Sequence, residues 1–221
     1  MTRPVLYIGN KNYSSWSMRP WLALKWGAIA FDEKIIPLGG EGYGQSQIKE
    51  VREVSPSGRV PALHIGDVAI YESLAICEWA AEQAPGLWPA ESLARADARA
   101  ASSEMHAGFA AVRRDMSCNI RRRLPSEPDW PADTRTDLAQ LFALWERLLK
   151  RYGGPFLFGQ RSIADAMFAP VCTRLRTYKV TAPDFAQTYC DTIFADAAFR
   201  EWERASEAET WTIEQSEALY R

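Results

Sequence analysis

The strongest constraint on the fold is a change of sequence pattern near residue 85. Before it, short apolar runs of strand length alternate with helical stretches, whereas after residue 90 only helical patterns remain. The predicted strands are 5–8 and 33–38, followed by a hairpin whose arms, 62–65 and 68–71, are joined by Gly66-Asp67. The strands are therefore confined to the first part of the chain.

Three helical patterns accompany these strands. They are 18–26, which ends at Gly27, a short polar stretch at 45–54, and 73–84, which stops at Pro85-Gly86. The resulting order is strand, helix, strand, helix, strand, strand, helix. This order predicts an α/β sheet with one antiparallel edge.

The remainder of the chain is predicted to be all helical. A long helix is expected over 94–123, with Gly108 its one weak point, and an amphipathic helix over 133–152. Ser162 to Asp165 form a capping-box pattern that opens a further helix, and 184–208 holds one or two more. The composition thus predicts two closely packed domains, 1–84 and 90–221.

Composition excludes several classes of function. The 221 residues carry a net charge of −2, which argues against wrapping nucleic acid. No apolar run is long enough for a membrane span, and the N-terminus lacks a signal-peptide pattern, so a cytoplasmic protein is expected. The four cysteines form no C-x-x-C pair and the two histidines lie far apart, so neither a disulfide framework nor a metal site is expected.

Charge is distributed unevenly along the second domain. The segment 113–123 carries five Arg against one Asp, and the chain from residue 201 carries six Glu against two Arg. Aromatic residues do not interleave with the arginines, so solvated helix faces are favoured over a nucleic-acid site.

The first segment that could carry chemistry is Asn12 to Arg19, between the first strand and the first helix. Its three serines, Ser14, Ser15 and Ser17, stand where backbone N–H groups at a helix start lack partners, which suits an anion or a thiolate. A serine hydroxyl that donates to a thiolate lowers the pKa of that thiol. The alternative is that Ser17 is a simple N-cap and the other two serines form a loop.

Two more segments fall at the same end of the predicted sheet. In one, Val60-Pro61 stands at the mouth of a strand; a cis bond there would expose the Val60 backbone to an added peptide strand, although most X-Pro bonds are trans. In the other, Glu72-Ser73 joins a strand to a helix. Glu72 could hold an ammonium and Ser73 a carboxylate, the two charges of an α-amino acid; a plain helix cap is the alternative.

Taken together, these segments resemble those of the cytosolic glutathione transferases across essentially the whole chain. The first 84 residues resemble the thioredoxin-fold domain of that family, and the rest resembles its all-helical domain. The S-S-W-S-M-R stretch at 14–19 resembles the S-S-C-S-x-R signature of the zeta class, which includes maleylacetoacetate isomerases. Val60-Pro61 resembles the cis-proline site of the family, Glu72-Ser73 its γ-glutamyl-binding pair, and Ser162 to Asp165 its capping box.

The resemblance implies an enzyme that uses glutathione as a co-substrate and needs no metal. Ser14 would be the catalytic residue that stabilises the glutathione thiolate for attack on a small hydrophobic electrophile. The implied substrate-binding residues are Ser15, Ser17, Arg19, Gln45, Val60, Pro61, Glu72, Ser73, His106 and Phe109. Gln45 or Gln47 would reach the glycine carboxylate, and His106 with Phe109 would line the electrophile pocket. The resemblance also implies a homodimer.

Two departures from the zeta pattern weaken the isomerase alternative. Trp16 stands where the signature has Cys, which removes a thiol and adds bulk. Asp115 falls in the region that lines the isomerase substrate site, where it would repel a dianion unless Arg113, Arg114 or Arg121 offset it. Thiol conjugation is therefore the leading function.

Two rival functions remain on the same fold. One is a binding or regulatory scaffold without chemistry, which need not keep Ser14, Pro61, Glu72 and Ser73 together. The other, a thiol-disulfide oxidoreductase, is disfavoured because Ser and Trp stand where a redox cysteine would be.

Overall fold

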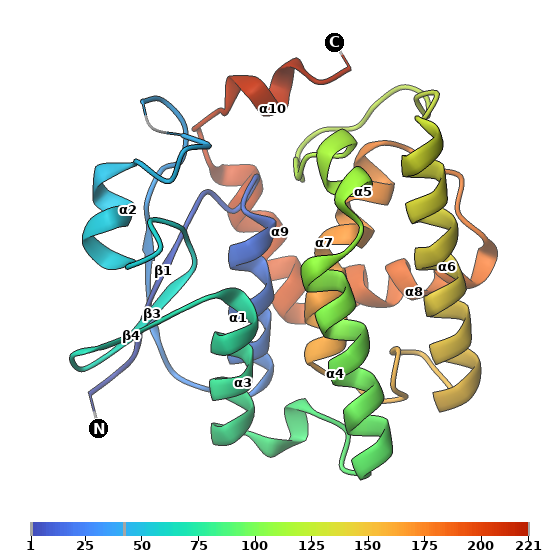
Figure 1. The fold of residues 1–221 in the computed structure, drawn as a ribbon, viewed down its shortest axis with the longest axis horizontal. Helices are drawn as coiled ribbons and strands as arrows, with labels where there is room; N and C mark the ends of the chain where they lie inside the picture. Colours follow the sequence, from blue (N-terminus) through green and yellow to red (C-terminus); the bar gives the residue numbers. More distant parts are fainter. Residues whose placement is uncertain (1, 42, 221) are drawn as a thin grey trace.

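The computed structural model describes residues 2–41 and 43–220. Its α/β part contains a four-stranded sheet in the order β2-β1-β3-β4, with helices packed beside it (Figure 1). The elements of this part are β1 (Val5–Ile8), α1 (Ser15–Trp26), β2 (Asp32–Ile35), α2 (Lys49–Val54), β3 (Ala62–Ile65), β4 (Val68–Tyr71) and α3 (Ser73–Gln83). The predicted order of strands and helices is confirmed.

The sheet differs from the prediction in the place of its antiparallel strand. β1 pairs in parallel with β2, with Val5 opposite Asp32, whereas β3 runs antiparallel to both β1 and β4. The antiparallel strand is therefore internal, because the hairpin inserts its first arm next to β1. This order brings the loop after β1, the loop before β3 and the β4–α3 turn to one end of the sheet.

The helical part follows a short 3-10 turn at Pro85–Leu87. Its helices are α4 (Ser92–Ala107), α5 (Ala110–Asp115), α6 (Ala132–Tyr152), α7 (Ile163–Thr177), α8 (Asp184–Ala195), α9 (Ala197–Ala208) and α10 (Glu214–Ala218). The amphipathic helix expected over 133–152 is confirmed as α6. No strand is named within the described residues beyond β4.

The single long helix expected over 94–123 is wrong. The chain breaks at Gly108, where a Cβ atom would lie 2.8 Å from the carbonyl oxygen of Glu104. Phe109 then adopts a left-handed conformation with φ 53°. Helix α5 ends at Asp115, and the arginines that follow lie outside any helix.

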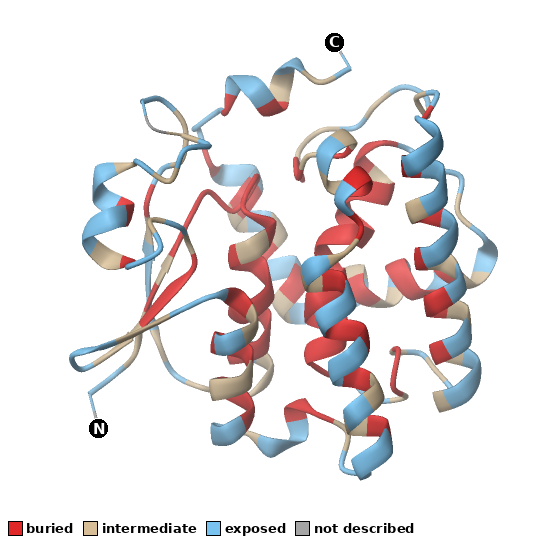
Figure 2. Ribbon diagram, in the orientation of Figure 1, coloured by how far each residue is buried: buried red, intermediate tan, exposed pale blue. Residues whose placement is uncertain are grey.

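Helix α7 forms the centre of the molecule. Almost all of its residues are buried, which marks a helix enclosed by others rather than one with a single buried stripe (Figure 2). It packs against α1 from the α/β part and against α4 from the helical part. The two parts are therefore joined by a continuous core.

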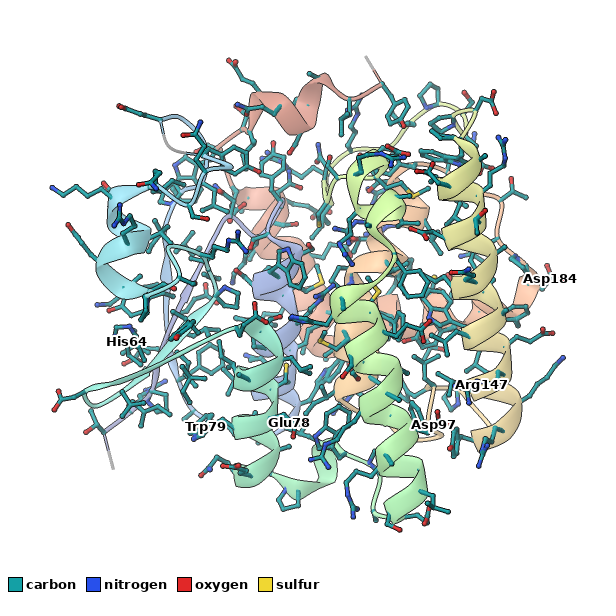
Figure 3. All side chains as sticks on the ribbon, in the orientation of Figure 1. His64, Glu78, Trp79, Asp97, Arg147 and Asp184 are labelled. Atoms are coloured by element: carbon teal, nitrogen blue, oxygen red, sulfur yellow. The ribbon has the colours of Figure 1, made fainter. Side chains whose placement is uncertain are left out.

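Ion pairs on the surface add to this packing. Arg147 of α6 makes a bidentate pair with Asp97 of α4, at 2.9 and 3.1 Å, and Arg99 of α4 pairs with Glu78 of α3 (Figure 3). The second pair joins the α/β part to the helical part.

The capping box of α7 is confirmed. The Asp165 carboxylate accepts hydrogen bonds from the backbone N–H groups of Leu157 and Ser162, at 3.1 and 2.8 Å, and from the hydroxyl groups of Ser162 and Tyr189. Burial raises the pKa of Asp165 to about 6, while these donors favour its charged form. One buried carboxylate thus satisfies four donors around the start of the central helix.

Replacing Asp165 should test this role directly. Asp165→Ala leaves buried donors without an acceptor, so we expect the free energy of unfolding in urea to fall by about 3 kcal/mol. The matched control is Asp184→Ala, which removes an exposed carboxylate from the first turn of α8 and should cost less than about 1 kcal/mol (Figure 3). An equal, small fall in the free energy of unfolding of the two variants would contradict the role of Asp165 as the acceptor for these buried donors.

Candidate functional site

A cavity of about 490 Å³ opens where the three motif-bearing loops meet α4. It lies at the sheet end formed by the loop after β1, the loop before β3 and the β4–α3 turn. Its lining residues are Tyr13, Ser14, Trp16, Leu38, Tyr43, Gly44, Ser46, Ile48, Val51, Ser57, Gly58, Arg59, Val60, Pro61, Glu72, Ser73 and His106. The three predicted segments thus border one cavity.

Of the three early serines, Ser14 is the one that lines this cavity. It is the N-cap of α1, so the helix starts at Ser15, earlier than the predicted residue 18, and Ser17 is not the cap. The Ser14 hydroxyl donates to Ser17 Oγ at 2.7 Å, and Ser17 Oγ also accepts from the backbone N–H of Gly9 at 3.1 Å. A chain of hydrogen bonds therefore holds the Ser14 hydroxyl at the positive end of α1.

Ser15 and Ser17 do not line the cavity. Both are buried, Ser17 within the chain of bonds just described and Ser15 beside α7. The Ser15 hydroxyl accepts a hydrogen bond from the guanidinium group of Arg174, at 3.1 Å. These two serines support the loop from beneath.

The β4–α3 turn contributes two polar groups. Glu72 has φ 110°, a strained value for a residue with a side chain, and it precedes the first turn of α3. Ser73 is fully buried, and its hydroxyl has no hydrogen-bond partner among the described residues. An unpaired buried hydroxyl at a helix start is suited to receive a ligand carboxylate.

Glu72 is also held from the helical part. His106 Nε2 of α4 lies 2.9 Å from the Glu72 carboxylate, and the His106 ring packs edge-on against Trp16, with ring centroids 5.2 Å apart. His106 was expected to line the electrophile side of the site, and it does border the cavity. Phe109, expected beside it, is buried in the core and does not.

The loop before β3 supplies a cation that sequence reasoning left unassigned. The Val60-Pro61 bond is cis, and both residues line the cavity. Arg59 lines it too, and its Nε donates to Ser46 Oγ at 3.0 Å. Gln45 and Gln47 are exposed and do not line the cavity. The sequence feature that could have predicted Arg59 as a cavity residue is its position directly before Val60.

Arg19 and Asp115 also lie away from the cavity lining. Arg19 is fully buried behind Trp16, with its guanidinium carbon 4.2 Å from the centre of that ring. Asp115 pairs with Arg114 at 2.7 Å and accepts a hydrogen bond from the Thr134 hydroxyl. The expectation that Asp115 would repel an anionic ligand is therefore wrong for this cavity. Hydrogen bonds from Arg114 lower the pKa of Asp115.

The C-terminal part of the chain holds the loop that presents Ser14. The Glu209 carboxylate accepts from the backbone N–H groups of Lys11 and Asn12, at 2.6 and 3.0 Å, and Trp202 Nε1 donates to the Lys11 carbonyl at 3.0 Å. Arg121 donates to backbone carbonyls of Glu209 and of Trp211. Arg121 is therefore an internal tether, not part of the solvated helix face that was expected.

The roof of the cavity comes from the same region. The Tyr13 hydroxyl donates to Glu217 at 2.6 Å, and the Ser216 side chain acts on the hydroxyl of Tyr43. Burial raises the pKa of both tyrosines. Helix α10 thus lies against two aromatic residues of the cavity lining.

Other classes of site lack support in the described residues. No group of three His, Cys, Asp or Glu side chains there could hold a metal ion, and no helix is long and apolar enough to cross a membrane. The four cysteines are free and buried, and burial raises the pKa of Cys77 and Cys118. None of them lines the cavity.

Comparison with known families gives two matches. Residues 13–83 match the glutathione S-transferase N-terminal domain, and residues 94–211 match the glutathione S-transferase C-terminal domain. Among curated proteins, the chain is 30% identical to the maleylacetoacetate isomerase of Rattus norvegicus over 182 residues, 80% of this chain and 81% of that one. A probable maleylacetoacetate isomerase of Caenorhabditis elegans is 30% identical over 172 residues, 76% of this chain and 77% of the relative.

Solved structures share the fold. A glutathione transferase homolog from Burkholderia, with bound glutathione, superposes with a TM-score of 0.70 at 23% identity, over 95% of this chain and 100% of that chain. A theta class glutathione S-transferase from Xanthomonas axonopodis, also with glutathione bound, superposes with a TM-score of 0.66 at 24% identity, over 91% of this chain and 97% of that chain. At these identities the likeness concerns the fold.

The Glu209 tether can be tested by mutation. Glu209→Ala leaves the buried N–H groups of Lys11 and Asn12 without their charged acceptor, so we expect the free energy of unfolding to fall by about 2–3 kcal/mol. Glu207→Ala, an exposed carboxylate two residues earlier, should change it by less than about 0.5 kcal/mol. Urea denaturation measures both. A Glu209→Ala protein as stable as the control would contradict the tether.

Proposed function

The chain belongs to the glutathione S-transferase family, and from this premise we propose that the cavity binds glutathione with its sulfur against Ser14. The observation that carries the proposal is the position of Ser14, which is at once the N-cap of α1 and a cavity residue. The protein is accordingly a glutathione-dependent enzyme, and its reaction begins with the thiolate of the bound tripeptide.

The hydrogen-bond chain through Ser17 explains how Ser14 would hold that thiolate. Gly9 N–H occupies one lone pair of Ser17 Oγ, which leaves the Ser17 proton free to turn toward Ser14. The Ser14 proton can then turn to the sulfur. Successive hydrogen bonds polarise one another, so Ser14 becomes a stronger donor than an isolated hydroxyl. A donor of this kind lowers the pKa of the bound thiol.

The other lining groups match the remaining charges of glutathione. Glu72 would take the α-ammonium of the γ-glutamyl residue, and Ser73 with the start of α3 would take its carboxylate. The Val60 backbone would pair with the cysteinyl residue. For the glycine carboxylate we propose Arg59 in place of Gln45, because Arg59 lines the cavity and presents a cation.

The electrophile would lie on the helical side of the sulfur, against Trp16 and His106. For conjugation, the thiolate donates an electron pair to an electrophilic carbon, a C–S bond forms, and a leaving group such as halide departs with its bonding pair. Binding both reactants in one cavity supplies proximity, and Ser14 keeps the nucleophile charged. No metal takes part in this scheme.

A second candidate, cis–trans isomerisation, is favoured by the names of the curated relatives, which are maleylacetoacetate isomerases. The same thiolate would add to a carbon–carbon double bond, the resulting single bond would rotate, and elimination would return the thiolate. Because Asp115 is paired outside the cavity lining, the repulsion expected from it no longer weighs against an acidic substrate. A non-catalytic scaffold is the remaining alternative.

Ser14→Ala tests the proposal against these alternatives. We expect glutathione still to bind, while turnover of a generic aryl halide falls by about 10- to 100-fold, because one to two pKa units of thiol activation are lost. The control is Ser92→Ala, which removes an exposed hydroxyl at the start of α4. An activated cis-alkene dicarboxylate assayed in parallel separates isomerisation from conjugation.

Two outcomes of this experiment would contradict the proposal. Full activity in Ser14→Ala would contradict the role of Ser14. A wild-type protein that binds no glutathione in calorimetry would contradict the enzyme and favour the scaffold.

We further propose that the protein is a cytoplasmic homodimer of two-domain subunits divided as 1–84 and 90–221. Large apolar side chains are exposed on β4 and at the start of α4: Val68 is 62%, Tyr71 44% and Leu93 71% exposed. Exposed apolar groups of this size suit an interface between copies. Four free, buried cysteines are compatible with a reducing compartment.

The interface can be tested by light scattering. We expect the wild type to be dimeric and Leu93→Arg to weaken the dimer by at least about tenfold, since a buried unpaired charge opposes association. Trp211→Arg, at an exposed apolar residue of the C-terminal segment, should leave the dimer intact. A monomeric wild type, or a Leu93→Arg protein that remains fully dimeric, would contradict this interface.

A further inference from the structure

Arg19 is an unusual residue for the interior of a protein. It lies on α1, is 0% exposed, and none of its three guanidinium nitrogens has a hydrogen-bond partner among the described residues. A buried cation without hydrogen bonds is unfavourable unless other groups stabilise it. The structure therefore keeps a charge in its core that the packing alone does not require.

The surroundings of Arg19 add positive charge. Trp16 covers its guanidinium group at 4.2 Å, and the guanidinium carbon of Arg113 on α5 lies 5.8 Å from the same indole ring. Arg174 of α7 is buried nearby and its charge acts on Arg19. From α3 and the residue before it, the groups that act on Arg19 are the buried thiol of Cys77 and the carboxylate of Glu72.

Negative charge around this cluster is scarce. The Glu72 side chain is 57% exposed and already pairs with His106. Asp137 acts on Arg113, and its carboxylate accepts the backbone N–H groups at the start of α5. Burial and the charges of Arg174 and Arg113 lower the pKa of Arg19 to about 9, so it remains a cation at neutral pH. The region behind Trp16 thus has an excess of positive charge.

This charge is placed behind the residues that face the cavity. Arg174 donates to Ser15 Oγ, the residue next to Ser14, and to the carbonyls of Met116 and Pro170. Arg19 follows Ser14 by five residues, a rise of about 7.5 Å along the helix axis. Arg19 contacts Trp16, which lines the cavity, and unit charges up to about 10 Å apart in partly buried protein interact by more than the thermal energy.

We propose that Arg19, together with Arg174 and Arg113, is a positioning residue whose charge, acting through Trp16 and the start of α1, keeps the sulfur of bound glutathione in its thiolate form. This inference rests on the proposed function. The cluster does not touch the sulfur; it stabilises the anion through space and adds to the hydrogen bond from Ser14. The thiolate in turn balances the excess positive charge of the cluster.

A structural role alone would predict something different. If Arg19 only filled space, a methionine of similar length would serve as well, and removing an unpaired buried charge would raise stability. If its charge acts on the sulfur, Arg19→Met should leave glutathione bound but less ionised. Arg19→Lys keeps the charge and should retain most of the effect. The ionisation of the bound thiol therefore separates the two roles.

The experiment titrates the ultraviolet absorbance of the thiolate in the protein–glutathione complex between pH 5 and 9. We expect the pKa of the bound thiol to rise by about one unit in Arg19→Met, a roughly tenfold loss of thiolate below that pKa. Arg19→Lys should stay near the wild type. Arg151→Met, at an exposed arginine of α6, is the control and should show no shift.

Arg113→Met provides a second, independent variant if Arg19→Met does not fold. Arg113 is partly exposed and lies on the short helix α5, and its removal should raise the thiol pKa by a smaller amount. An unchanged thiol pKa in the folded Arg19→Met protein would overturn the inference; if that variant does not fold, an unchanged pKa in Arg113→Met would do so. A wild type that binds no glutathione would instead overturn the proposed function, and this inference with it.

Discussion

The site depends on the contact between the loop after β1 and a segment almost two hundred residues further along the chain. Glu209 accepts the N–H groups of Lys11 and Asn12, and Trp202 donates to the Lys11 carbonyl. These bonds fix the loop that ends at Ser14, the N-cap of α1. A helix start supplies free N–H groups wherever it occurs, but it becomes a thiolate site only when its first residue faces a cavity. The helical part therefore sets the geometry of the α/β part.

Positive charge gathers along the same boundary. Lys11 is buried but paired with Glu33 at 2.8 Å and covered by Trp21 and Trp202, so its charge is balanced. Arg19 has no such partner. Of these two buried cations, Lys11 is balanced by its carboxylate partner, whereas Arg19 is the one that we propose stabilises an anion. Trp16, which replaces the cysteine of the zeta signature, forms the wall between the available cation and the cavity.

Short-range patterns were sufficient to predict most of the fold. Two short apolar runs joined by Gly66-Asp67 predicted the hairpin, and three-four spacing predicted α6, because both signals depend on positions close in sequence. The break at Gly108 was visible in the sequence only as a weak point of a longer helix, because nothing in the sequence pattern predicts the left-handed conformation that Phe109 adopts there. Motif-loop residues such as Ser14 and Glu72 line the cavity. The tether formed by Arg121 and Glu209 was not predicted, because the groups that these residues contact are distant in sequence.

The most direct test of the central claim is a crystal structure of the protein with glutathione, read for one distance. The account predicts the glutathione sulfur within about 3.5 Å of Ser14 Oγ, with the Ser17 hydroxyl turned to donate to Ser14. A sulfur that lies instead against Ser15, or a tripeptide bound elsewhere than in the cavity between the β1–α1 loop and α4, would contradict it.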